Sequence, residues 1–255
     1  MKIAGIQKLT LVDFPGHVAA TLFTQGCSFR CGFCHNPELV LPEKFEGLLS
    51  EGEVFEFLEA RYGKLTGICL TGGEPLLQPD AGKFISHMKA LGFDVKLDTN
   101  GSFPDRLEKI IKDGDVDYIA MDIKNSLSKY AQTISITHLS LPITHSNEKL
   151  LNDEINDKWK LKNDKLKKDI ERSIRLIMSS GIDYEFRTTV CHPYHTVADF
   201  EGIGQLIQGA KRYFIQNYQD SKRINESIEY SQFTDRELSE TRKIMLEYVK
   251  EVEIR

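Results

Sequence analysis

Short apolar runs alternate with amphipathic segments along this chain of 255 residues. The apolar runs are typical of buried strands, and they occupy residues 17–23, 67–71, 94–98, 117–124, 183–190 and 212–217. Strands that alternate with helices predict right-handed βαβ units and a parallel sheet. Six such strands predict an α/β fold, either an open doubly wound sheet or an incomplete (β/α)6 barrel.

Helices are predicted between the strands by capping signals and by apolar residues at helical spacing. Ser50 and Glu53 form one capping box, and Thr234 and Glu237 form a second, which begins a C-terminal helix at about residues 234–250. Gly181 is expected to end another helix. The predicted apolar faces are Val54, Phe57, Leu58 and Tyr62; Phe84, Ile85, Met88 and Leu91; Ile170, Ile174, Ile177 and Met178; and Leu238, Met245, Tyr248 and Val252.

One polar stretch interrupts this pattern. Between residues 147 and 168, 16 of the 22 residues are Asn, Asp, Glu or Lys. We interpret residues 133–168 as a solvated, partly disordered insertion within a single domain that spans residues 1–255. The alternative is a partner-docking helix anchored by Trp159, with Leu151, Ile155 and Leu166 on the same face.

Composition narrows the classes of function. Apolar residues make up 40% and charged residues 28% of the chain, as in an ordinary soluble protein. A net charge of −5 argues against a nucleic-acid partner, because no basic excess is present to neutralise phosphates. The chain has no run of eighteen apolar residues and no N-terminal leader, so we expect no membrane contact and a cytoplasmic location.

Three of the five cysteines lie within eight residues, as C-x3-C-x2-C at Cys27, Cys31 and Cys34. Three thiolates on one short loop suit three corners of an iron–sulfur cube. No fourth cysteine has suitable spacing, so one iron would stay open for another ligand. The alternatives are a zinc site with His35 as its fourth ligand, and a chance cluster of structural cysteines.

Polar side chains recur at the carboxyl ends of the predicted strands, where parallel barrels place their catalytic and ligand-binding residues. Charges buried there need partners or a charged ligand. Four inward-facing strands of this kind favour a zwitterionic ligand such as S-adenosylmethionine (SAM), and Asp98 with Asp122 can also hold a small cation. The candidate residues are Gly72, Gly73 and Glu74; Lys96, Asp98, Thr99 and Asn100; Asp122 and Lys124; Glu185, Arg187 and Thr189; and Gln216.

These motifs resemble a known family. The three-cysteine motif followed by Gly-Gly-Glu-Pro at residues 72–75 is the signature of the radical SAM superfamily. Further matches are LVDFPG at 11–16, TQG at 24–26, CHNPEL at 34–39, LDTNG at 97–101 and FRTTV at 186–190. Together they resemble glycyl-radical-enzyme activating proteins, and most closely the activating proteins of anaerobic ribonucleoside-triphosphate reductase, which are related to the pyruvate formate-lyase activating enzyme. The resemblance covers residues 1–130 and 168–217.

The resemblance implies an incomplete (β/α)6 TIM-like barrel of the radical SAM type and one [4Fe–4S] cluster bound by the three cysteines, with SAM on the open iron. Gly72, Gly73 and Glu74 would hold the ammonium end of SAM, and the backbone of Phe33 would contact adenine. Further implied site residues are Asp98, Thr99 and Asp122, which would coordinate a monovalent cation; Asn100 of the LDTNG motif; Lys124 and Arg187, near SAM; and Gln216, where the formate-lyase type has a histidine.

The implied activity is that of an oxidoreductase that cleaves SAM and generates a glycyl radical on a partner protein. The implied partners are the large subunit of anaerobic ribonucleotide reductase and a flavodoxin- or ferredoxin-type electron donor. Alternatives are activation of another glycyl radical enzyme, a radical SAM reaction on a small molecule, and a non-enzymatic iron–sulfur carrier or scaffold. We interpret Cys69 as a core residue, and Cys191, His192 and His195 as part of a loop near the barrel mouth.

Overall fold

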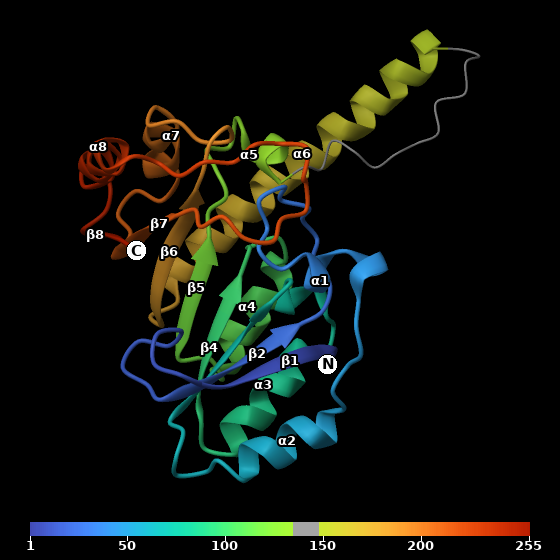
Figure 1. Ribbon diagram of the computed structural model, residues 1–255, viewed down its shortest axis with the longest axis vertical. Coiled ribbons are helices and arrows are strands. Elements are labelled where there is room, and N and C mark those ends of the chain that lie inside the picture. The colour runs from blue at the N-terminus through green and yellow to red at the C-terminus, as the bar shows by residue number, and fades with distance from the viewer. Residues whose placement is uncertain (135–147) are drawn as a thin grey trace.

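The computed structural model describes residues 1–134 and 148–255, and for residues 148–160 it describes the backbone alone. Within these residues one sheet contains eight strands, which lie side by side in the order of the chain (Figure 1). The strands are β1 (Ile3–Thr10), β2 (Ala19–Thr24), β3 (Gly67–Gly72), β4 (Asp94–Thr99), β5 (Tyr118–Asp122), β6 (Asp183–Val190), β7 (Arg212–Asn217) and β8 (Glu251–Ile254).

Helices follow most of the strands. They are α1 (Pro37–Val40), α2 (Glu51–Glu59), α3 (Ala81–Ala90), α4 (Pro104–Asp113), α5 (Tyr130–Thr133), α6 (Glu148–Ser179), α7 (Asp199–Leu206) and α8 (Asp235–Met245), with short 3₁₀ turns η1 (Pro42–Lys44) and η2 (Pro75–Leu77). Helix α4 packs against both α3 and α6, and α7 packs against α8. They cover one face of the sheet and leave its other face as the inside of a partial barrel.

The sheet order decides between the two predicted architectures. The pairs from β2–β3 to β7–β8 are all parallel, and the order of the strands never reverses. A doubly wound sheet has such a reversal at its centre, so the incomplete barrel is confirmed. The six predicted strands are β2 to β7. Strand β1, which pairs antiparallel with β2, and strand β8, which pairs parallel with β7, were not predicted.

Alternation along the strands separates apolar from charged side chains. In β4, Val95 and Leu97 are fully buried against the helices, while Lys96 and Asp98 face the barrel interior, where they form an ion pair. Burial of each large aliphatic side chain contributes about 1.5–3 kcal/mol. The apolar face therefore stabilises the fold, and the opposite face carries the charged groups.

Both predicted capping boxes are present, with side-chain and backbone hydrogen bonds at Ser50–Glu53 and Thr234–Glu237. Two helix predictions were wrong at their ends. Tyr62 lies beyond α2 and is 71% exposed. The last helix, α8, ends at Met245, and Val252 lies in β8 instead.

The polar segment 148–168 forms the first part of α6, which continues through the predicted helix to Ser179. The segment therefore belongs to one long helix, whose N-terminal part projects from the barrel (Figure 1). Leu166 is buried. The side chains of Leu151, Ile155 and Trp159 lie outside the described residues, so the docking-helix alternative stays a prediction.

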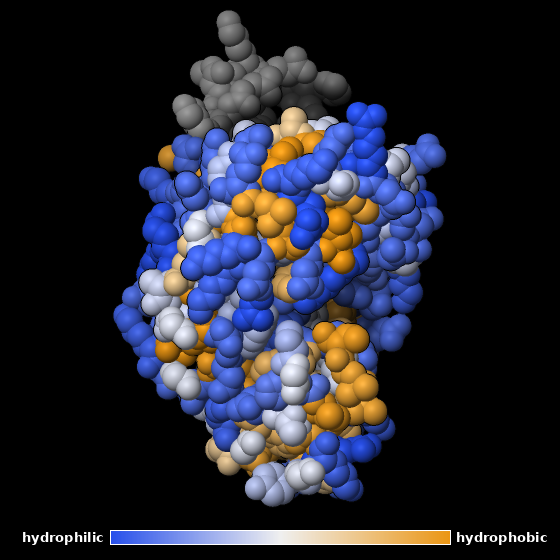
Figure 2. Space-filling view, turned by 90° about the vertical axis from the view of Figure 1, so that its left-hand side faces the viewer, coloured by the Kyte–Doolittle hydropathy of each residue, from blue (hydrophilic) through white to orange (hydrophobic). Residues whose placement is uncertain are grey.

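The surface seen in Figure 2 is mostly hydrophilic, with separate hydrophobic areas. Exposed apolar side chains include Leu9, Leu11 and Val12, at the end of β1 and in the turn that follows it. Along the described residues, no helix combines the length and the apolar character that a bilayer crossing requires.

Candidate active site

A cavity of about 250 Å³ lies at the carboxyl ends of the parallel strands. This is the end at which parallel barrels place their active sites. Most of the predicted site residues line it, namely Cys27, Cys31, Cys34, Phe33, Gly72, Gly73, Asp98, Thr99, Asn100, Asp122, Lys124 and Arg187. The topology of the sheet therefore brings residues from five separate segments to one place.

The cysteine loop follows β2 directly and forms one wall of the cavity. Cys31 is buried, and Cys27 and Cys34 are half-buried. Burial raises the pKa of the Cys27 thiol to about 11 and that of Cys31 to about 12. Metal binding must therefore displace protons from these thiols. The Cys27 sulfur already accepts hydrogen bonds from the backbone N–H of Phe29, at 3.4 Å, and the side-chain amide of Asn100, at 3.7 Å.

The Gly72–Gly73 pair lets the end of β3 approach the start of the cysteine loop. Gly73 N–H donates to the Thr24 carbonyl at 2.8 Å, and Glu74 N–H donates to the Gly26 carbonyl at 2.8 Å. A Cβ on Gly73 would lie 2.0 Å from the Gly26 oxygen, and Gly72 has a φ of +115°. Larger residues do not fit this backbone contact. The glycines thus fix the cysteine loop against β3 as well as lining the cavity.

The Glu74 side chain lies beneath the cavity and is fully buried. Its carboxylate accepts hydrogen bonds from the Thr99 hydroxyl at 2.8 Å, the Asn100 N–H at 2.6 Å and the Leu76 N–H at 3.0 Å. Burial, only partly offset by these hydrogen bonds, raises the pKa of Glu74 to about 7. In this structure Glu74 orients the end of β4.

Charged side chains from three strands form a network on the cavity floor. Arg187 lies between Asp98 and Asp122 and donates to both, at 2.9 Å for Asp98 Oδ2. Lys124 donates to Asp122 at 2.8 Å, and Lys96 donates to Asp98 at 2.6 Å. Although burial opposes ionisation, Arg187 and the lysines hold the pKa of both carboxyl groups below its usual range. Burial likewise opposes the charge of Lys124, but Asp122 raises its pKa.

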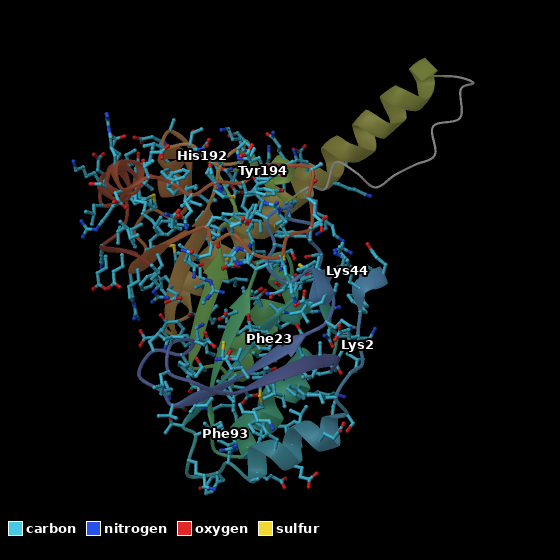
Figure 3. All side chains as sticks on the ribbon, viewed as in Figure 1. Lys2, Phe23, Lys44, Phe93, His192 and Tyr194 are labelled. Atoms are coloured by element: carbon cyan, nitrogen blue, oxygen red, sulfur yellow. The ribbon has the colours of Figure 1, made fainter. Side chains whose placement is uncertain are left out.

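An aromatic group supports the cysteine loop from below. Phe33 is 3% exposed and packs on Tyr194, with ring centroids 5.6 Å apart, and edge-on to His195 at 6.1 Å. Tyr194 lies at the carboxyl end of the strands, at the opposite end of the barrel from Phe93 (Figure 3). The fully buried His195 hydrogen-bonds the Lys124 carbonyl at 2.8 Å. The loop that carries Cys191 and His195 therefore packs against the site.

Four of the candidate residues are not among those that line the cavity in the described structure, namely Glu74, Lys96, Glu185 and Gln216. Gln216 lies on β7, in register with Thr189. The candidate Thr189 does line the cavity, and so do Thr71 and His35, for which no SAM contact was predicted. The position of Thr71 carried a signal, because this residue directly precedes the glycine pair at the end of β3.

The three cysteines of the loop border the same cavity, as the predicted three-cysteine cluster site requires. Cys27, Cys31 and Cys34 border the cavity, whereas Cys69 and Cys191 are fully buried and are not among its lining residues in the described parts of the chain. In residues 1–134 and 161–255, no three His, Cys, Asp or Glu side chains lie close enough together to share one metal ion. An iron–sulfur cube makes no such demand, since each cysteine binds a different iron.

A model of the radical SAM superfamily matches residues 21–207, which include the cysteine loop and strands β3 to β6. The chain belongs to this superfamily. Its members bind a [4Fe–4S] cluster and SAM, so the two predicted cofactors are confirmed.

Curated relatives indicate a branch of the superfamily. A Methanocaldococcus jannaschii protein with the provisional name glycyl-radical enzyme activating enzyme MJ1227 is 29% identical over 99% of this chain and 95% of its own length. The pyruvate formate-lyase-activating enzyme of Clostridium pasteurianum is 34% identical over 49% of this chain and 52% of its own length. The chain is thus homologous to activators of glycyl radical enzymes, and it matches about half the length of the formate-lyase type.

Solved structures support the fold alone, because their sequence identities are low. Streptococcus suis SuiB bound to S-adenosylmethionine superposes with a TM-score of 0.60 at 11% identity, over 91% of this chain and 48% of that one. TYW1 with a lysine-pyruvate adduct superposes with a TM-score of 0.58 at 13% identity, over 94% and 78%. The chain spans about half the length of SuiB.

Proposed function

We propose that this chain cleaves SAM at a three-cysteine [4Fe–4S] cluster and generates a glycyl radical on the large subunit of anaerobic ribonucleoside-triphosphate reductase. The observation that carries the proposal is similarity, over almost the whole chain, to a protein named as a glycyl-radical enzyme activator. The LVDFPG, LDTNG and FRTTV motifs support the reductase branch. The five free thiols are compatible with the cytoplasm as the proposed location.

In this proposal each wall of the cavity has one task. Cys27, Cys31 and Cys34 would hold the cluster, which would pass one electron from the flavodoxin- or ferredoxin-type donor to the sulfonium of SAM. Lys124 and Arg187 attract the SAM carboxylate, because they are the basic groups that line the cavity.

The opposite wall would receive the amino group and the nucleoside of SAM. The glycine pair presents backbone to the ammonium, and Thr99 and Asn100 are held in place by Glu74. Phe33 presents its backbone beside the adenine. Gln216 stays a proposed ligand contact, although it is not among the residues that line the cavity in the described structure.

The target glycine is assigned by similarity and needs its own test. Purified, anaerobically reconstituted protein would be reduced and mixed with SAM and either anaerobic ribonucleotide reductase or pyruvate formate-lyase. We expect a glycyl radical signal in electron paramagnetic resonance with the reductase, and 5′-deoxyadenosine in similar amount. A signal with formate-lyase alone would replace the proposed partner with the second candidate, which the half-length matches to formate-lyase activators favour.

Controls separate the chemistry from the partner. A reductase variant that lacks the target glycine should give 5′-deoxyadenosine without the protein radical. A flavodoxin or ferredoxin, the proposed donor type, should replace the chemical reductant. If the reconstituted protein produced no 5′-deoxyadenosine under any reductant, the enzymatic proposal would be wrong, and an iron–sulfur carrier would remain.

A further inference from the structure

Each carboxylate oxygen of Asp98 and Asp122 has a basic nitrogen beside it. Asp98 Oδ1 accepts from Lys96 at 2.6 Å and Oδ2 from Arg187 at 2.9 Å. Asp122 Oδ2 accepts from Lys124 at 2.8 Å, and Oδ1 accepts from Arg187 Nε. Three cationic side chains thus donate hydrogen bonds to all four carboxylate oxygens, which are the atoms through which Asp98 and Asp122 would bind a metal ion.

Lys96 is the member of this network without an assigned task. Its side chain is 2% exposed and it does not appear among the cavity-lining residues of the described chain. Its ammonium nitrogen lies near the Cys69 sulfur, at 3.9 Å, and 5.9 Å from the ring centroid of Tyr118. The Asp98 carboxylate is its ion-pair partner. Lys96 therefore reaches Asp98 from inside the barrel, and not from the ligand side.

The charge balance of the site follows from these contacts. Lys96, Lys124 and Arg187 carry three positive charges against the two carboxylates. Glu185, which lies 3.9 Å from Arg187, is also paired with Arg255 at 3.3 Å, so it does not reverse this balance. An added alkali ion would enter a site that is already positive, and it would have to displace a buried ion pair to reach an oxygen.

The implied monovalent cation therefore does not fit the residues present. We propose that the Lys96 ammonium is the built-in counter-ion of Asp98 and takes the place of a bound Na⁺ or K⁺. SAM binding to this protein is then independent of alkali metal ions, and Lys96 is a positioning residue that acts through Asp98 and Arg187. The part of this inference that concerns SAM rests on the proposed function.

The first test uses protein without its cluster, so that it does not depend on SAM chemistry. Thermal unfolding would be followed in choline chloride, NaCl and KCl at equal ionic strength. Wild-type protein should unfold at the same temperature in all three salts. Lys96→Met leaves Asp98 without one partner, and we expect a Tm lower by about 10 °C in choline chloride, partly restored by NaCl or KCl. Equal Tm values for variant and wild type, or a wild-type Tm that rises with alkali ions, would overturn the inference.

The second test measures SAM affinity of the reconstituted protein in the same salts. Wild-type affinity should agree within about twofold among the salts, while Lys96→Met should bind about tenfold more weakly in choline chloride and regain affinity in KCl. Lys96→Arg keeps the positive charge and replaces Lys96→Met in this test if the Met variant does not fold. The SAM affinity of Lys96→Arg should remain independent of alkali ions. An affinity that changed with these ions would contradict the proposal. Lys89→Met removes a lysine of α3 that pairs with Asp94 and Asp117 outside the site, and this variant should depend on the salts as wild type does. If wild-type protein bound no SAM at all, the proposed function would fail while the unfolding test still decided the role of Lys96.

Discussion

The backbone N–H of Asn100 donates to the buried carboxylate of Glu74 at 2.6 Å, which ties the end of β4 to the turn after β3. The Thr99 hydroxyl donates to the same carboxylate. Sequence alone suggested a Glu74 that faces the ligand. In the structure Glu74 is buried behind the cavity-lining residues, where its hydrogen bonds fix the positions of Thr99 and Asn100 on the cavity wall.

Protonation of Glu74 should make stability depend on pH. Burial raises its pKa from 4.5 to about 7, so the folded protein holds a proton that the unfolded chain has released between these values. The unfolding free energy should therefore fall as pH rises from about 4.5 to 7, by about 3 kcal/mol at most. Glu74→Gln cannot ionise and should remove this part of the slope. Urea unfolding of cluster-free protein at several pH values measures it.

The control for that series is Glu56→Gln, at an exposed position of α2. Its stability should follow the wild-type pH profile. Identical slopes for Glu74→Gln and wild type would show that Glu74 is ionised throughout this range, and that its burial does not govern its protonation.

The Gly73 backbone contact predicts a strong effect of one methyl group. Gly73→Ala would place Cβ 2.0 Å from the Gly26 carbonyl oxygen, which is backbone and cannot rotate away. We expect a loss of at least about 1–3 kcal/mol in unfolding free energy, together with poor cluster incorporation, because Gly26 immediately precedes Cys27. Gly47→Ala is the matched control, since a Cβ there meets nothing within 4 Å. Similar stability and iron content for the two variants would contradict the tight contact.

Cluster ligation can be tested by comparing two buried cysteines. Cys31→Ala should lose the visible absorbance of the cluster and SAM cleavage together, because three protein thiolates are the minimum for this site. Cys69→Ala removes a thiol that is fully buried in β3, away from the cavity lining, and should keep both. Iron content and 5′-deoxyadenosine yield are the measurements. Retention of the cluster in Cys31→Ala would refute the assignment.

The sequence predicted those parts of the fold that depend on local pattern. Strands β2, β3 and β5 are mainly apolar, whereas β4 and β6 alternate apolar with polar residues, and β7 is apolar in its middle and polar at its ends. The capping boxes at Ser50 and Thr234 define where helices begin. The edge strands were missed for a physical reason. Most residues of β1 are partly or fully exposed, and β8 has four residues with Val252 alone buried, so neither shows the alternation of a core strand.

The sequence predicted which types of residue form the candidate site and which face of each strand carries them. Period-two alternation placed Asp98, Asp122 and Arg187 inside the barrel, and the structure joins them. Which carboxylate pairs with which base depends on the register between strands, and a single sequence does not contain it. The bridge from Arg187 to Asp98 and Asp122, and the hydrogen bond from Thr99 to the buried Glu74, are consequences of that register.

Arg187 provides the most direct test of the charged network. Its guanidinium joins two carboxylates through different nitrogens, which a lysine ammonium cannot reproduce. Arg187→Lys should fold but bind SAM at least about tenfold more weakly.

Arg187→Met leaves Asp98 and Asp122 short of a cation, which should lower the free energy of unfolding by about 3–5 kcal/mol. In wild-type protein the lowered pKa of these two carboxyl groups stabilises the fold above about pH 4. This contribution is lost as the pH falls through their folded pKa. Acid unfolding of the Met variant should therefore begin at a higher pH than that of wild type. Arg175→Met, at an exposed position of α6, is the control. If Arg187→Lys matched wild type in both affinity and acid stability, the two-carboxylate bridge would have no role in the site.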